Sequence, residues 1–152
     1  MDFGITAADG HVGDKAWNVV GHVYTPKLHT PNVMIWHAQI PDGTFVPPHI
    51  HPTQDEWIYM LTGDLEVEFG HDEGKLTTHK AGPADLVRMP RGKSHGIFNR
   101  SGAEATCVFG VAPSRKLFDL FGALDGVTDP EELVRLSALH EVDFLPPPPD
   151  AG

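Results

Sequence analysis

Hydrophobic residues recur at every second position in several short segments before about residue 112. In segment 32–40 the large apolar residues fall on one face of an extended chain, as expected of a strand with one buried side: Met34, Trp36, Ala38 and Ile40. Glycine and proline separate such segments, and the pattern predicts strands at 19–24, 32–40, 56–61, 65–69, 76–79, 85–89, 94–99 and 105–111. The regular spacing predicts a mainly β sandwich or barrel over about residues 19–112, in which 56–61 and 65–69 pair as a hairpin.

After Pro113 the hydrophobic period lengthens to that of an α-helix. The first predicted helix begins at a Ser114 cap, ends at Gly126 and has one apolar face, formed by Leu117, Leu120, Phe121 and Leu124. A second helix begins at Asp129, followed by Pro130, and its buried stripe is Leu133, Leu136 and either Leu139 or His140. The sequence therefore predicts two C-terminal helices within about residues 114–141, followed by extended prolines at 146–149.

Composition narrows the class of protein. A chain of 152 residues is expected to form one domain, residues 1–152, and its 11 Lys and Arg against 21 Asp and Glu give a net charge of −10, which argues against nucleic-acid binding. The single cysteine, Cys107, excludes an internal disulfide and a cysteine-based zinc cluster. With no basic and apolar leader and no long apolar run, we expect a cytoplasmic protein that does not span a membrane.

Histidine is the residue type that can carry metal chemistry here, since the chain has 10 of them. His49 and His51 are one residue apart, so on a strand both project from the same face and can reach a single ion. Glu56 follows after a short break and offers a carboxylate, as a ligand or as a nearby base. His95 supplies a third imidazole directly after a Pro and Gly turn.

The spacing of these residues resembles the two sequence motifs of the cupin superfamily. The first motif, G-x5-H-x-H-x(3,4)-E-x6-G, is filled by Gly43, His49, His51, Glu56 and Gly63, and the second, G-x5-P-x-G-x2-H-x3-N, by Pro90, Gly92, His95 and Asn99. The second motif departs at its first glycine, where Ala84 stands. The resemblance implies a double-stranded β-helix, or jelly-roll barrel, in which one divalent transition metal per subunit (Fe, Ni, Mn, Co, Cu or Zn) is bound by His49, His51, Glu56 and His95.

Other residues of the predicted barrel are candidates for lining a hydrophobic or aromatic substrate. The predicted apolar inner wall is formed by Phe45, Met60, Phe69, Met89 and Ile97. His37 interrupts the apolar pattern of its strand, so it either touches substrate or lies on the outer surface, and the outer surface is the favoured alternative. The parity of Glu56 predicts Ile58 and Met60 on its side of the strand.

A second resemblance concerns the reaction. The run from Glu56 through Val67, the string from Ala81 to His95 and the ending Val142-Asp-Phe-Leu-Pro-Pro are similar to small single-domain cupins related to quercetinase. It implies a dioxygenase that uses O2 on an enolic or phenolic aromatic compound, with Glu56 taking the substrate's hydroxyl proton as general base. Two alternatives stay open, since the fold does not choose the reaction: a redox-neutral metal-dependent cyclase or isomerase, and a non-catalytic small-molecule binder.

Small single-domain cupins are commonly dimers, and this resemblance implies a homodimer. Its contact is expected from Trp57 and Tyr59 together with the N-terminal arm, residues 1–18. The alternative is that both pack within one subunit.

Overall fold

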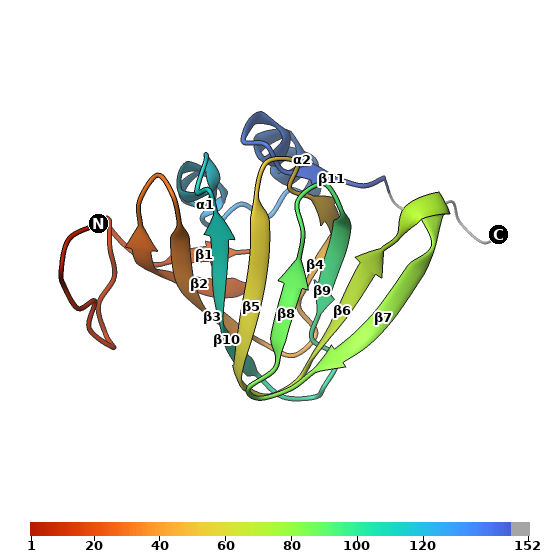
Figure 1. Ribbon diagram of the computed structural model, residues 1–152, viewed down its shortest axis with the longest axis horizontal. Coiled ribbons are helices and arrows are strands. Elements are labelled where there is room, and N and C mark those ends of the chain that lie inside the picture. The colour runs from red at the N-terminus through yellow and green to blue at the C-terminus, as the bar shows by residue number, and fades with distance from the viewer. Residues whose placement is uncertain (147–152) are drawn as a thin grey trace.

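The computed structural model describes residues 1–146, so most of the predicted proline extension lies outside the described residues. Two antiparallel sheets face each other, and two helices lie across one end of the space between them (Figure 1). The strands are β1 (Trp17–Val19), β2 (His22–His29), β3 (Met34–Ile40), β4 (Phe45–Ile50), β5 (Asp55–Thr62), β6 (Leu65–Gly70), β7 (Leu76–Ala81), β8 (Leu86–Met89), β9 (Ser94–Phe98), β10 (Ala105–Ala112) and β11 (Asp143–Phe144). The remaining elements are a short 3-10 helix η1 (Asp72–Gly74) and the helices α1 (Leu117–Leu124) and α2 (Pro130–Leu139).

The six-stranded sheet has the order β1-β2-β3-β10-β5-β8, and the five-stranded sheet has the order β11-β4-β9-β6-β7. The inner faces of both sheets bury the core, in which the alternating residues predicted for β3 are all 1% exposed or less. Trp36 and Phe109 stack at its centre, with ring centroids 5.1 Å apart. These observations confirm a mainly β jelly roll with two C-terminal helices.

Two details of the predicted strands are wrong. The segment 19–24 is not one strand, because Val20 and Gly21 adopt positive φ values of 50° and 88° and form the turn of the β1–β2 hairpin. The predicted hairpin between 56–61 and 65–69 also fails, since β5 pairs with β10 and β8 while β6 pairs with β7 and β9. The chain crosses from one sheet to the other at Gly63, where an added Cβ would lie 2.8 Å from the carbonyl oxygen of Glu104.

The turn before β8 contains the departure from the second motif. Ala84 stands where the motif has glycine, and it adopts φ = 70°, the left-handed conformation that glycine enters without strain. Backbone bonds fix this turn, since Ala84 donates its N–H to the carbonyl of Met60 at 2.9 Å and Asp85 donates to that of Gly82 at 3.0 Å. The surrounding pairing therefore imposes the conformation on alanine.

The helices begin differently from one another. The side chain of Asp129 accepts a hydrogen bond from the backbone of Glu131 at 3.2 Å, which confirms it as the cap of α2. Ser114 does not cap α1; it is buried and donates to the carbonyl of Thr30 at 2.5 Å, and α1 begins only at Leu117. In α2 the stripe closes with half-buried His140, whereas Leu139 is 60% exposed. No helix in residues 1–146 is long and apolar enough to cross a membrane.

The segments expected at a dimer contact make contacts within the subunit. Lys27 donates from Nζ to the carbonyls of Ala7 and Gly10, each at 2.7 Å, and so ties the N-terminal arm to β2. Trp57 packs over Gly110, where there is no room for a Cβ. Tyr59 is 44% exposed on the outer face, and its part in a dimer stays a prediction.

Candidate metal centre

Strands of both facing sheets bring the four predicted ligands together inside the barrel. His49 lies on β4, His51 directly follows it, Glu56 lies on β5 and His95 lies on β9. His49 and His95 are direct cross-strand partners, so their side chains leave the sheet on the same face. One donor atom from each of the four side chains lies within 4.8 Å of all the others, and all four residues are buried.

The polar atoms at the centre of this group are poorly satisfied by the protein. Oε2 of Glu56 lies 2.9 Å from Nε2 of His51 and 3.4 Å from Nε2 of His95. Even so, Glu56 Oε2 and both ring nitrogens of His95 make no aligned hydrogen bond to any described residue. Buried polar atoms without partners are costly, and three imidazoles with one carboxylate are a donor set that divalent transition metals accept. The group therefore fits a metal ion.

The outer nitrogens of two imidazoles are held by hydrogen bonds. His49 donates from Nδ1 to the carbonyl of Pro47 at 2.8 Å, and His51 donates from Nδ1 to Oε1 of Gln54 at 2.8 Å. Gln54 in turn donates from its amide nitrogen to the carbonyls of Pro113 and Ser114, at 3.0 and 2.7 Å. These bonds leave Nε2 of both histidines free to face the centre, and such outer partners fix ligand orientation in metal sites. The sequence analysis missed Gln54, although its place between the first-motif histidines and Glu56 was a signal.

Mutual attraction sets the charge states in the group. Burial alone would raise the pKa of Glu56, but His51 and His95 hold it well below its usual range. Burial would lower the pKa of His51, yet the neighbouring carboxylate of Glu56 raises it instead. Burial lowers the pKa of His49 well below its ordinary value, so this imidazole is neutral, as a metal ligand must be.

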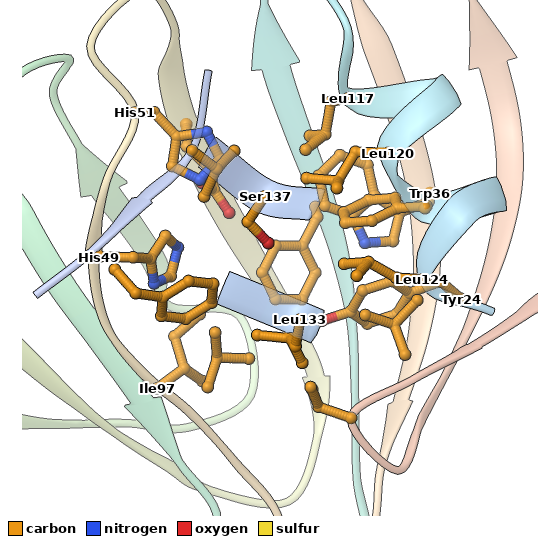
Figure 2. Close-up of a pocket in the computed structure, with 18 residues that line it drawn as sticks. Tyr24, Trp36, His49, His51, Ile97, Leu117, Leu120, Leu124, Leu133 and Ser137 are labelled. Carbon is orange, nitrogen blue, oxygen red and sulfur yellow. The ribbon is translucent and has the colours of Figure 1, made fainter. Parts of the chain in front are cut away.

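The group borders an apolar pocket, which we call the central pocket (Figure 2). Its volume is only about 50 Å³, and residues of both helices close it. The part of its lining on α1 and α2 is Leu117, Leu120, Phe121, Leu124, Leu133 and Ser137, and the barrel contributes Tyr24, Trp36, Val46, Ile97 and Phe109. The C-terminal helices therefore cover the end of the barrel at which the predicted ligands lie.

The central pocket contains one of the six predicted substrate residues, Ile97. Val46 occupies the place predicted for Phe45, which is 51% exposed and stacks on Phe98 outside the barrel. The reason is a β-bulge: Val46 pairs with Ile97 and His49 with His95, so β4 has one residue more than β9 in this interval. The extra residue reverses the alternation, and Phe45 points away from the face that carries His49.

The other predicted substrate residues are distributed differently. Met60 is fully buried in the core beside neither pocket, and half-buried His37 is on the face of β3 opposite Trp36 and Ala38, the favoured alternative. Phe69 and Met89 line a second hollow of about 530 Å³, which we call the side pocket. Its wall includes His95 and the charged residues Asp72, Lys75, Arg88 and Lys93. Contact of any of these residues with a substrate stays a prediction.

A buried pair that the sequence analysis did not single out lies behind the central pocket. His22 is 0% exposed, and its Nδ1 is 3.0 Å from the hydroxyl of Tyr24, whose ring lines the pocket. Burial lowers the pKa of His22 to about 4 and, together with the charge of Glu56, raises that of Tyr24 well above its ordinary value. Both groups are therefore uncharged at neutral pH.

Comparison with known proteins agrees with this architecture. Residues 36–110 match the family described as the cupin domain. The chain is 31% identical over 77 residues to the tetracenomycin polyketide synthase protein TcmJ of Streptomyces glaucescens, covering 51% of this chain and 48% of that protein. It is 33% identical over 113 residues to germin-like protein 3-7 of Oryza sativa subsp. japonica, covering 70% and 46%. The chain thus spans about half the length of the curated relatives it matches.

Among solved structures, the chain is similar to an oxalate oxidase in complex with the substrate analogue glycolate. The TM-score is 0.55 at 25% sequence identity, and the match covers 62% of this chain and 52% of the oxidase. Residues 36–110 therefore form a cupin domain, and the chain carries the cupin fold around a buried group of three histidines and one glutamate that is consistent with a metal site.

Proposed function

We propose that the protein is a metal-dependent dioxygenase that acts on an enolic or phenolic aromatic compound. The observation that carries the proposal is the buried group of His49, His51, Glu56 and His95, whose donor atoms lie within 4.8 Å of one another beside an apolar pocket. These four residues would hold a divalent transition metal, which when bound supplies a Lewis acid and the capacity to react with O2. The structural similarity to an oxalate oxidase supports an oxidative reaction.

Glu56 is the residue of this group that can accept a proton. Its carboxylate is ionised, because the neighbouring imidazoles hold its pKa well below the usual range. A hydroxyl of the substrate placed at Oε2 would transfer its proton there, which leaves an electron-rich enolate or phenolate.

The lining of the central pocket excludes water from the reacting atoms. Its walls are almost entirely aliphatic and aromatic, and its volume of about 50 Å³ holds no more than a few water-sized molecules. A dry apolar pocket beside the four candidate ligands strengthens the electrostatic interactions at their charged and polar atoms.

Dissolved-oxygen uptake tests the proposal directly. Metal-free protein would be reloaded separately with Fe(II), Mn(II), Co(II), Ni(II), Cu(II) and Zn(II) and offered flavonols and related enolic aromatics. We expect uptake with at least one redox-active metal, loss of metal and uptake in His95→Ala, and no change in His79→Ala, which alters an exposed histidine on β7.

Glu56→Gln separates proton transfer from metal binding. We expect turnover to fall by about 100-fold or more, because general-base catalysis contributes roughly 10² to 10⁴. Metal content is measured on the same samples. Full turnover in Glu56→Gln at unchanged metal occupancy would contradict the assigned role.

A redox-neutral cyclisation or isomerisation is the second candidate. The similarity to a polyketide synthase protein, 31% identical over 77 residues, favours it. Equal conversion of an aromatic polyketide with and without O2, still dependent on His95, would select this reaction over the dioxygenase.

A further inference from the structure

We propose that the side pocket binds the carboxylate of an aromatic acid, so that the substrate of this site is an anionic aromatic. This inference rests on the proposed function and specifies its substrate class. The side pocket measures about 530 Å³, within the roughly 300–1,000 Å³ of small-molecule sites, whereas the central pocket measures about 50 Å³. An aromatic ring therefore has room in the side pocket and none in the central one.

The charge of the side pocket is opposite to that of the whole chain. Although the chain has a net charge of −10, three cationic side chains line this hollow against one carboxylate, Asp72. Lys93 is paired with Asp72 at 2.9 Å. Within residues 1–146, Lys75 and Arg88 make no ion pair. Two uncompensated cations remain, and a guanidinium is suited to binding a carboxylate through two parallel hydrogen bonds.

The apolar floor of the side pocket lies next to the metal-binding residues. Phe69 is the cross-strand partner of His95, and Met89 is the cross-strand partner of Glu56. Directly opposite residues share one face of the sheet, with Cβ atoms roughly 5 Å apart. A ring packed on Phe69 and Met89 would therefore lie beside both ligands. Lys75 and Arg88 also line this hollow. Arg88 leaves the edge strand β8 on the face opposite Met89, so its guanidinium would reach a carboxylate at the rim of the hollow, around the edge of the sheet.

His95 offers a further reason for an acceptor in this hollow. His49 and His51 each donate from Nδ1 to an oxygen, but Nδ1 of His95 is buried without a partner among the described residues. Its other nitrogen, Nε2, faces Glu56 at 3.4 Å, and the residue lines the side pocket. An oxygen of a bound anion would accept a hydrogen bond from Nδ1 of His95, as protein oxygens already do for the other two imidazoles.

Calorimetric titration of zinc-loaded protein with benzoate and with benzamide tests the inference without turnover. Benzamide has the shape of benzoate and no charge, so we expect benzoate to bind about tenfold more tightly at low salt, and the difference to shrink as salt rises. Arg88→Gln and Lys75→Gln should each weaken benzoate binding by about fivefold and leave benzamide unchanged. Lys80→Gln is the matched control, because Lys80 is an exposed β7 lysine paired with Asp64 outside this hollow.

Two results would overturn the inference. The first is equal affinity for benzoate and benzamide. The second is benzoate binding that is lost in metal-free protein but unchanged in Arg88→Gln, because the carboxylate would then be bound by the metal. The two proposals fail separately. Benzoate binding that depends on Arg88, with no O2 uptake on any hydroxybenzoate, supports the anion site and rejects the dioxygenase. Flavonol oxidation that is unchanged in Arg88→Gln and Lys75→Gln supports the dioxygenase and rejects an anionic substrate.

Discussion

The two pockets beside the candidate metal centre differ in size, in polarity and in the elements that cover them. The central pocket is small, apolar and covered by α1 and α2 (Figure 2), whereas the side pocket is about ten times larger and is lined by Lys75, Arg88 and Lys93. His49, His51 and Glu56 line the first, and His95 lines the second. The four candidate ligands thus lie between a small apolar pocket and a larger hollow lined by cationic residues, and only the larger one has room for an aromatic ring.

The largest expected effect comes from breaking the closure of the central pocket. Leu120 is 1% exposed, lies on α1 and lines the pocket, so Leu120→Ala should lower the free energy of unfolding by about 2–5 kcal/mol through lost burial and the cavity it leaves. Urea denaturation measures this change. Leu139→Ala, on the exposed side of α2, should stay within about 0.5 kcal/mol. Equal stability of the two variants would show that α1 does not seal the barrel as described.

The next effect concerns the hydrogen bond to Gln54 that orients the imidazole of His51. Gln54→Leu removes the acceptor of His51 Nδ1 and the donor to the carbonyl of Pro113, and it leaves the carbonyl of Ser114 with only the backbone N–H of Leu117 as donor. Loss of such an outer partner lowers metal affinity by roughly 10- to 100-fold, which competition with a chelator measures. The control Gln39→Leu changes an exposed glutamine on β3 and should bind metal normally. Unchanged affinity in Gln54→Leu would reject the orienting role.

The third effect is the smallest over any single pH unit, and it tests whether water reaches the buried residues behind the central pocket. The pKa of His22 is about 4 in the folded protein because of burial, and about 6.5 in the unfolded chain. As pH falls from 6.5 to 4 the unfolded state takes up the proton first, so His22 should cost up to about 1.4 kcal/mol of stability per pH unit. The stability difference between metal-free wild type and His22→Gln should therefore change across this window and stay constant above pH 7. A constant difference at every pH would show that water reaches His22.

The grouping of the four candidate ligands was predictable from sequence because it depends on local spacing. Alternation puts His49 and His51 on one face, and the Gly and Pro spacing aligns Glu56 and His95 with the cupin motifs. The apolar periods of β3 and α1 likewise identify their buried residues without knowledge of what they pack against.

The remaining features depend on which strands pair, and that is a property of the whole chain. Phe45 was assigned to the interior by alternation, but the bulge that turns it outward is visible only against β9. The local sequence favoured a hairpin between β5 and β6, yet the two strands belong to different sheets and pair with other strands. The contribution of α1 and α2 to the central pocket was likewise not predictable, because helix periodicity identifies an apolar face but not the surface on which that face packs.

Ala84 has a consequence for how relatives of this protein are recognised. Its φ of 70° is the conformation that glycine favours, so the turn before β8 keeps its geometry although the residue of the motif is absent. A search pattern written in residue letters rejects the chain at this position, whereas one written in backbone conformations accepts it. Chains with alanine, asparagine or aspartate at this turn are accordingly expected to present the same four ligands, and family surveys that demand glycine there will undercount them.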